Sequence, residues 1–328
     1  MGQWSEPPRT VAEPVTEAAA PRVLALGELL VEVMRKELDV PLDRPGELVG
    51  PFPSGAPAIF ASAVARLGAP AGIIGVVGAD DFGECVVARL RSDGVDTAHV
   101  RVVTDHPTGV AFVAYSGDGS RHFVYNLATS AASLLSPGDV LPDYVAAAGF
   151  VHVAGSTLAV SRSSRESCYK AAATCKAAGG RVSFDPNVRP ELLGGEPVDS
   201  VVGPLLELCS VLLPSGAEAS MLTGQADEAD ACRSLVERGI PMVALKRGRD
   251  GSTVFTADEC IDVPSLAVTE VDPTGAGDCF DAGFVVGLLQ GWDPARAARF
   301  ANIVGALSVT RQGPMEGVPY LAEVMALM

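Results

Sequence analysis

A glycine-rich turn precedes a long apolar segment in the carboxy-terminal third of the chain: Asp272-Pro273-Thr274-Gly275-Ala276-Gly277-Asp278 is followed by an apolar stretch that ends at Leu289. A turn of small residues at the start of a helix offers unpaired N–H groups and the positive end of the helix dipole, which together suit an anion. A carboxylate beside that anion, here Asp278, is placed to take a proton from a hydroxyl that attacks a phosphoryl group. The alternative is a purely structural role, in which Asp278 only caps the helix.

Short apolar runs alternate with helix-length segments along most of the chain. Strands that alternate with helices pair in parallel through right-handed crossovers. The pattern therefore predicts an α/β protein, a layered α/β/α sandwich with a mostly parallel central sheet. The expected strands are 22–27, 71–77, 150–154, 182–184, 210–213 and 242–245, and the expected helices are 58–67, 82–93, 163–178, 227–238, 279–290 and 294–310.

A different pattern occurs between the first strands. Two apolar and aromatic runs, 109–116 and 120–126, flank Gly117-Asp118-Gly119, which predicts a β-hairpin. With the segment around 32–49, the hairpin is expected to form a small second sheet. We therefore expect one domain over 22–328, with the small sheet drawn from about 30–50 and 107–127, after a disordered tail over 1–21 that lacks the apolar and basic parts of a signal peptide.

Composition narrows the function classes. The formal net charge of -16 over 328 residues disfavours binding to nucleic acids or anionic membranes, which need clustered Lys and Arg. Seven cysteines include no C-x-x-C pair, so reduced thiols and a cytoplasmic location are expected. The four histidines have no metal-ligand spacing to one another. No G-x-G-x-x-G follows the first strand, which disfavours a Rossmann dehydrogenase.

The block 272–278 closely resembles the carboxy-terminal signature of the ribokinase-like (PfkB) carbohydrate kinases, and the resemblance extends from about Val23 to Glu316. It implies an ATP-dependent sugar kinase of ribokinase-like fold, similar to fructokinases, tagatose kinases and 2-keto-3-deoxygluconate kinases, in which the small sheet is a lid over the sugar. Asp278 would be the catalytic base, and the N–H groups of Gly275, Ala276 and Gly277 would form the anion hole. The D-x-T pair Asp272 and Thr274 would mark a K⁺ site, so K⁺ activation is an expectation beside ATP and Mg²⁺.

Four positions match sugar-binding segments of the family. They are Glu32 in Gly27-Glu28-Leu29-Leu30-Val31-Glu32, Gly55 in the segment that continues to Ile59, Asn126 in the lid strand, and Arg189 in Asp185-Pro186-Asn187-Val188-Arg189. Ile59 replaces the family's Asn, so one sugar contact is lost. The alternatives are a solvated edge acid for Glu32, a plain turn for Gly55, and an Asp-Pro-Asn turn around Asn187.

The nucleotide side is expected from three further segments. Glu218 keeps the family's magnesium-organising acid, acting through water, with Ser215 in place of Asn; a capping box explains the same pair equally well. Lys246 would place a point charge near the phosphates, in a turn whose Gly248 and Gly251 would lie along ATP, although a basic hairpin turn is the alternative. Asn302 holds a family position on the adenine side.

The substrate is less sharply indicated. Leu127 stands where 2-keto-3-deoxygluconate kinases carry an Arg for the sugar acid, and an unpaired carboxylate under a lid is costly. We therefore expect a neutral sugar, a ketohexose such as fructose or tagatose, with a sugar-acid kinase as an alternative. A non-catalytic sugar- or nucleotide-binding regulator is the alternative from another class, suggested by Ile59 and Ser215. A homodimer through the lid is a further expectation.

Overall fold

The computed structural model describes residues 22–117, 120–187, 193 and 195–328. The tail expected over 1–21 and the expected sugar-binding residue Arg189 lie outside these ranges.

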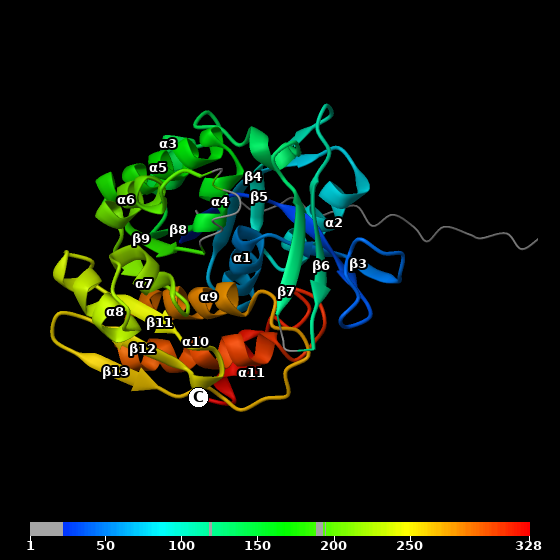
Figure 1. The fold of residues 1–328 in the computed structure, drawn as a ribbon. Helices are drawn as coiled ribbons and strands as arrows, with labels where there is room; N and C mark the ends of the chain where they lie inside the picture. Colours follow the sequence, from blue (N-terminus) through cyan, green and yellow to red (C-terminus); the bar gives the residue numbers. More distant parts are fainter. Residues whose placement is uncertain (1–21, 118–119, 188–192, 194) are drawn as a thin grey trace, which may run out of the picture.

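A nine-stranded sheet forms the centre of the molecule, in the order β13-β12-β11-β10-β9-β8-β1-β4-β5 (Figure 1). The strands from β11 to β5 in that order run parallel, and β12 and β13 add antiparallel pairings at one edge. The strands are β1 Val23–Leu26, β4 Ala71–Gly78, β5 Asp96–Val103, β8 Phe150–Ala154, β9 Arg181–Asp185, β10 Val211–Leu212, β11 Val243–Lys246, β12 Ser252–Phe255 and β13 Cys260–Val263. All six predicted strands belong to this sheet, and the predicted sandwich is confirmed.

Helices cover both faces of this sheet (Figure 1). Val23 and Ala25 of β1 enter one core while Leu24 and Leu26 enter the other, because successive side chains of a strand alternate between faces. The first core is closed by α1 Ala56–Arg66, α2 Asp81–Ser92, α9 Ala276–Leu289, α10 Pro294–Ser308 and α11 Leu321–Met325. The second is closed by α3 Pro142–Ala146, α4 Gly155–Val160, α5 Arg162–Ala177, α6 Val198–Leu208, α7 Glu218–Thr223 and α8 Glu228–Glu237.

A separate four-stranded sheet, called the small sheet below, stands beside the main one in the order β3-β2-β6-β7 (Figure 1). Its strands are β2 Leu30–Arg35, β3 Leu48–Ser54, β6 Gly109–Tyr115 and β7 Arg121–Asn126. The pairing of β6 with β7 is antiparallel, which confirms the predicted hairpin. β2 follows directly from the end of β1, so the small sheet is tied to the edge of the main sheet where the parallel strands end.

Several elements were not predicted from the apolar runs, among them β5, α6, β12 and β13. β5 is the last strand at its edge of the sheet, and Asp96, His99 and Arg101 interrupt its apolar residues. An edge strand that is partly solvated carries a weak hydrophobic pattern. β12 is well buried, but Ser252 and Thr253 make up half of its four residues, so it contains no continuous apolar run.

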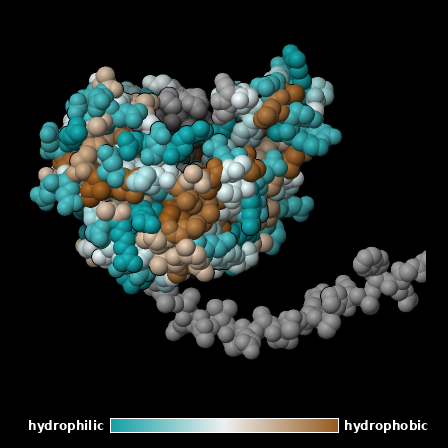
Figure 2. Space-filling view, turned by 90° about the horizontal axis from the view of Figure 1, so that it is seen from below, coloured by the Kyte–Doolittle hydropathy of each residue, from teal (hydrophilic) through white to brown (hydrophobic). Residues whose placement is uncertain are grey.

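The surface fits a protein that buries its apolar faces internally. On the face seen in Figure 2, hydrophilic side chains predominate and apolar ones form separate patches. Within the described ranges, none of the helices combines the length and apolar character needed to cross a bilayer.

Candidate active site

Two adjoining cavities open where the parallel strands of the main sheet end. One has a volume of about 820 Å³ and extends under the small sheet, and the other has a volume of about 620 Å³ and lies against α9 and α10. Both are lined by Lys246, Gly248, Pro273 and Gly277. Ligands of parallel sheets collect at this edge, and molecules in the two cavities would meet at these shared residues.

The amino-terminal end of α9 lies at the boundary between the cavities. Gly275 precedes the helix with a left-handed φ of 82°, and a Cβ there would lie 2.7 Å from the carbonyl oxygen of Pro314. Both the backbone and the contact therefore require glycine. Gly275 and Gly277 line the larger cavity, and Ala276 and Gly277 line the smaller. The structure thus brings the three expected anion-hole residues to the place where the helix dipole favours negative charge.

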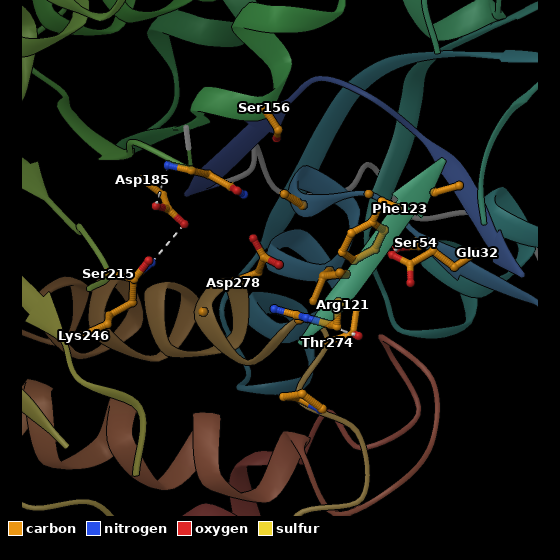
Figure 3. A pocket seen from close by; sticks show the side chains of 18 of the residues that line it. Glu32, Ser54, Arg121, Phe123, Ser156, Asp185, Ser215, Lys246, Thr274 and Asp278 are labelled. Carbon is orange, nitrogen blue, oxygen red and sulfur yellow. Dashed lines mark hydrogen bonds and ion pairs between the residues drawn. The ribbon is translucent and has the colours of Figure 1, made fainter. Parts of the chain in front are cut away.

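Asp278 lies in the first turn of α9 and lines the larger cavity. Its side chain points into the space between Asp185 and the small sheet (Figure 3), although the residue is only 8% exposed. A carboxylate in this position can reach a hydroxyl in the larger cavity while the helix terminus beside it holds an anion.

The ammonium of Lys246 lies between two buried carboxyl groups. Its Nζ is 2.9 Å from Oδ2 of Asp185 (Figure 3) and 3.1 Å from Oδ1 of Asp281. Burial alone would lower the pKa of Lys246, but the two carboxyls outweigh it and raise the pKa. Burial and the nearby Asp185 hold the pKa of Asp281 well above its usual range, whereas Lys246 outweighs burial and lowers that of Asp185. The cluster therefore fixes a charged ammonium beside Gly277, at the boundary of the cavities.

Two glutamates line the larger cavity on the side of the small sheet. Glu28 accepts hydrogen bonds from the hydroxyls of Ser156 and Thr157, both at 2.6 Å. Glu32, as expected from the sequence, also lines the cavity and accepts a hydrogen bond from Ser54 Oγ at 2.7 Å. Oriented carboxylates of this kind bind sugar hydroxyls through charge-assisted hydrogen bonds.

Gly55 joins the small sheet to α1 and lines the same cavity. Its φ is +108°, and a Cβ would lie 2.3 Å from the carbonyl oxygen of Glu28. The glycine therefore lets the start of α1 approach the β1–β2 connection. Ile59, which replaces the polar residue of the family pattern, also lines the cavity.

The small sheet contributes alternate residues of β7 to the cavity. Arg121, Phe123 and Tyr125 line it, together with the buried Leu127. Asn126 does not lie among the lining residues; it is exposed, and its Oδ1 accepts a hydrogen bond from Thr129. Side chains alternate along a strand, so the register that brings Tyr125 inward turns Asn126 outward. The expected sugar contact of Asn126 is thus not supported by its position.

Asp272 and Thr274, the expected K⁺ pair, lie in the turn before α9 and are both buried. Oδ1 of Asp272 accepts hydrogen bonds from the Thr274 backbone N–H at 3.0 Å and the Tyr115 hydroxyl at 2.9 Å. Its Oδ2 accepts one from the Gly313 N–H at 2.9 Å. The carboxylate thus shapes the turn, and a monovalent cation there would depend on backbone carbonyls for its other ligands.

Oxygen donors for magnesium lie near the phosphate end of the larger cavity. Oε2 of Glu218 accepts hydrogen bonds from the backbone N–H and hydroxyl of Ser215, at 2.7 and 2.8 Å. Only the first of these bonds belongs to a capping box, and the residue before α7 is Ala217, without a side-chain cap. Burial and the Asp185 carboxylate raise the pKa of Glu218. A divalent cation would relieve this repulsion, so the two carboxyls fit a hard ion. Across the described ranges, no group of three or more Asp, Glu, His or Cys side chains is arranged to hold a metal directly.

The smaller cavity contains most of the expected nucleotide positions. Gly248, Gly251 and Asn302 line it with apolar groups such as Phe280 and Val268. Asn302 is buried, and its Nδ2 donates to the carbonyl oxygens of Val263 and Pro264 at 3.0 and 3.3 Å. The amide therefore holds the wall of the cavity in place, and the apolar side chains beside it are of the kind that line binding sites for rings such as a purine.

The sequence analysis did not single out four residues of this region: Glu28, Tyr115, Arg121 and Asp281. Asp281 carried a usable signal, because a charged residue three positions after Asp278 interrupts an apolar helix. Glu28 lay within a quoted motif but was not chosen. Tyr115 and Arg121 gave no local signal, since only the docking of the β6–β7 hairpin brings them to the turn before α9.

Comparisons with known proteins agree with this geometry. Residues 20–320 match the model of the pfkB family of carbohydrate kinases. Fructokinase-1 of Oryza sativa subsp. japonica is 31% identical over 317 residues, 93% of this chain and 97% of that protein. The 2-dehydro-3-deoxygluconokinase of Bacillus subtilis (strain 168) is 32% identical over 269 residues, 81% of this chain and 83% of that protein. A putative ribokinase II from E. coli, solved in complex with ATP and Mg²⁺, is 40% identical with a TM-score of 0.88, and the match covers 93% of this chain and 98% of that one.

A helix terminus and a buried aspartate meet at the junction of two cavities in a ribokinase-like fold, and the family match spans nearly the whole chain. The chain therefore belongs to the pfkB family of ATP-dependent carbohydrate kinases.

Proposed function

We propose that this kinase transfers the γ-phosphoryl group of ATP to a hydroxyl of a neutral sugar, a ketohexose such as fructose or tagatose. The observation that carries the proposal is the position of Asp278, between the larger cavity and the amino-terminal end of α9. The sugar would occupy the larger cavity under the small sheet, and ATP would occupy the smaller one. Their reacting groups would then meet beside Gly277 and Lys246.

In this mechanism Asp278 takes the proton of the sugar hydroxyl as its oxygen bonds to the γ-phosphorus, and the bond from that phosphorus to the β-phosphate oxygen breaks to release ADP. The N–H groups of Gly275, Ala276 and Gly277 would stabilise charge that builds on the phosphates. Lys246 adds a fixed positive charge nearby. Glu28 and Glu32 would orient the sugar hydroxyls, and the small sheet would exclude water so that phosphate passes to sugar.

Magnesium, when bound, would neutralise phosphate charge, and Glu218 with Asp185 would organise it through water. Potassium would be held in the turn of Asp272 and Thr274, where the motif of the family supports the proposal and the carboxylate is already oriented. We further propose a cytoplasmic location, because the seven cysteines are free thiols and most of them are buried.

The neutral substrate is supported by Leu127, an apolar wall of the cavity where a sugar acid would need a cation. A sugar acid is the second candidate, because Arg121 enters the same cavity from β7. The relatives include both a fructokinase and a 2-dehydro-3-deoxygluconokinase. We favour the neutral sugar because the guanidinium of Arg121 is directed toward Thr274, with Nη1 3.4 Å from its Oγ1, at the phosphate end of the cavity.

The test is phosphorylation of D-fructose, D-tagatose and 2-keto-3-deoxygluconate at saturating Mg·ATP, with the phosphorylated product identified. We expect a higher kcat/KM for a ketohexose than for the acid. A clear preference for the acid would establish the second candidate and assign Arg121 to its carboxylate. ATP and sugar binding without turnover on a broad sugar panel would instead indicate the non-catalytic regulator.

We also propose that two copies of the chain associate through the outer face of the small sheet. A groove of about 640 Å³ lies there, lined in part by Leu48, Phe112 and Val124. Leu48 on β3 and Val124 on β7 are 46% and 47% exposed, so apolar side chains at both edges of the sheet are open to solvent in one groove, which is typical of an interaction surface.

A further inference from the structure

The β6–β7 hairpin of the small sheet is hydrogen-bonded to the turn that forms the anion hole. Tyr115 ends β6, and its hydroxyl lies 2.9 Å from Oδ1 of Asp272 and 2.8 Å from Oγ1 of Thr274. Arg121 begins β7, and its Nη1 donates to the same Thr274 oxygen at 3.4 Å. These bonds join residues more than 150 positions apart in the sequence, so they depend entirely on how the hairpin docks.

The donors and acceptors form one ordered chain. The Tyr115 hydroxyl donates to the Asp272 carboxylate, which leaves the Thr274 hydroxyl to donate to the Tyr115 oxygen and to accept from Arg121. The same carboxylate accepts the backbone N–H groups of Thr274 and Gly313. The network therefore runs from the small sheet, through the residue before Gly275, to the loop at Gly313. Hydrogen bonds in such a chain strengthen one another.

The environment keeps this network intact. Asp272 and Thr274 are only 3% and 6% exposed. A phenol is protonated at neutral pH, so the Tyr115 hydroxyl is available to donate to Asp272. A hydrogen bond from a neutral hydroxyl to a buried carboxylate belongs to the stronger class of such bonds.

We propose that Tyr115 is a positioning residue that couples the sugar lid to the phosphate-binding turn. With the hairpin docked, the hydroxyl fixes Thr274 and hence the backbone that leads into Gly275, while the same docking closes the larger cavity. Sugar under the small sheet and nucleotide at the anion hole would therefore stabilise one hydrogen-bonded arrangement and strengthen each other's binding. The inference rests on the proposed function, and it adds the physical link between the two substrate sites.

The test compares Tyr115→Phe with a matched control, Tyr144→Phe. Tyr144 is also partly buried and donates to a carboxylate, Oδ2 of Asp96, at 2.8 Å, but this carboxylate belongs to β5 and not to the turn before α9. The dissociation constant of Mg·AMP-PNP is measured with and without saturating D-fructose. In wild type and Tyr144→Phe we expect fructose to tighten nucleotide binding by about 5- to 150-fold, the usual range of coupling between sites. In Tyr115→Phe this factor should fall to about one to three, with each ligand alone still bound.

A second measurement does not depend on the identity of the sugar. Mg·AMP-PNP alone should slow amide exchange in β6 and β7 of wild type and Tyr144→Phe, and slow it clearly less in Tyr115→Phe. If fructose neither binds nor is phosphorylated, the proposed substrate is wrong. The exchange measurement with Mg·AMP-PNP alone still tests whether Tyr115 couples the hairpin to the nucleotide site. Equal protection of the hairpin in all three proteins, or a fructose effect on nucleotide binding that survives in Tyr115→Phe, would overturn the role of Tyr115.

Discussion

Asp278 combines two properties that a simple helix cap does not need. It lies in the first turn of α9, where a carboxylate is favoured by the helix dipole, and it is also nearly buried against a cavity. The exposed Asp81 also lies in the first turn of a helix, α2, but it lines neither cavity. Substitutions of these two aspartates can therefore distinguish a role at the end of a helix from a role in the reaction.

We expect Asp278→Asn to fold and to bind ATP, but to lose about 10²- to 10⁴-fold in kcat, because the amide cannot accept the hydroxyl proton. Asp81→Asn should leave kcat unchanged. Steady-state kinetics on the preferred sugar, with nucleotide binding measured in parallel, checks both. If Asp278→Asn kept sugar phosphorylation within about threefold of wild type, Asp278 would be a cap and not the base.

His152 on β8 is a buried histidine that the mechanism does not use. It stacks on Phe60 with the ring centroids 3.7 Å apart, and its Nδ1 lies 3.0 Å from Ser183 Oγ. Burial lowers the pKa of His152 to about 3. Below a pH of about 6.5 the unfolded chain takes up a proton that the folded protein excludes. The free energy of unfolding therefore decreases as the pH is lowered.

His152 should therefore contribute a loss of about 1.4 kcal/mol in the free energy of unfolding for each pH unit below about 6.5. Urea unfolding between about pH 6.5 and 4.5 should show a shallower pH dependence in His152→Phe, which keeps the ring stack. His99→Phe is the control, because His99 also packs on an aromatic ring, that of Tyr144, but is only partly buried. Parallel pH profiles for wild type and His152→Phe would show that His152 titrates normally in the folded protein.

At the scale of elements, the site depends on close approaches that only glycine allows. Gly55 lets α1 start against the β1–β2 connection, and Gly275 lets α9 start against the loop at Pro314. Both helices thereby present their amino-terminal ends to the larger cavity. Two helix ends and the ends of the parallel strands converge there, which concentrates hydrogen-bonding groups in one place.

Gly55→Ala should destabilise the protein by about 1–3 kcal/mol through backbone strain and should also raise the KM for the sugar, because the new Cβ would collide with the Glu28 carbonyl. Gly179→Ala is the matched control: its φ is +85°, but no atom lies within 4 Å of the added Cβ. The control should lose stability without a change in KM. Chemical denaturation measures the free energy of unfolding of both variants, and steady-state kinetics measures their KM for the sugar. The same KM in both variants would contradict the prediction.

At the scale of the molecule, the small sheet has two faces with different tasks. One face lines the larger cavity through residues such as Phe123 and Tyr125. The opposite face carries the groove that contains Phe112 and Val124, because alternate residues of a strand point to opposite sides. Association of two copies through the outer face would cover the groove and stiffen the sheet over the sugar.

We expect wild type to form dimers and Val124→Arg to contain a larger fraction of monomers at the same concentration, because a charged side chain would enter an apolar contact. Val102→Arg is the control, since Val102 is 59% exposed on β5, an edge strand of the main sheet, and does not line the groove. Sedimentation velocity over a range of protein concentrations measures both. A wild-type protein that stays monomeric at all concentrations would remove the proposed dimer, and dimers that persist in Val124→Arg would place the interface elsewhere.

The sequence by itself determined the elements whose signals are local. Apolar runs located six parallel strands, the Gly-Asp-Gly turn located the hairpin of β6 and β7, and the glycine-rich turn before Cys279 located the start of α9, where Asp278 lines the larger cavity. These features need only side-chain periodicity, turn chemistry and a helix end. The short or half-solvated strands β5, β12 and β13 lack such a pattern and were not found.

Tertiary structure alone decided which side chains meet. Three separate elements supply Lys246, Asp185 and Asp281. The sequence predicted only a phosphate contact for Lys246, whereas in the structure its ammonium forms buried ion pairs with both aspartates. The register of β7 places Tyr125 inside and Asn126 outside, a distinction that one residue of slippage would reverse. Tyr115 reaches Asp272 across 157 positions. Contacts of this kind depend on packing between distant segments, and no local pattern in the chain encodes them.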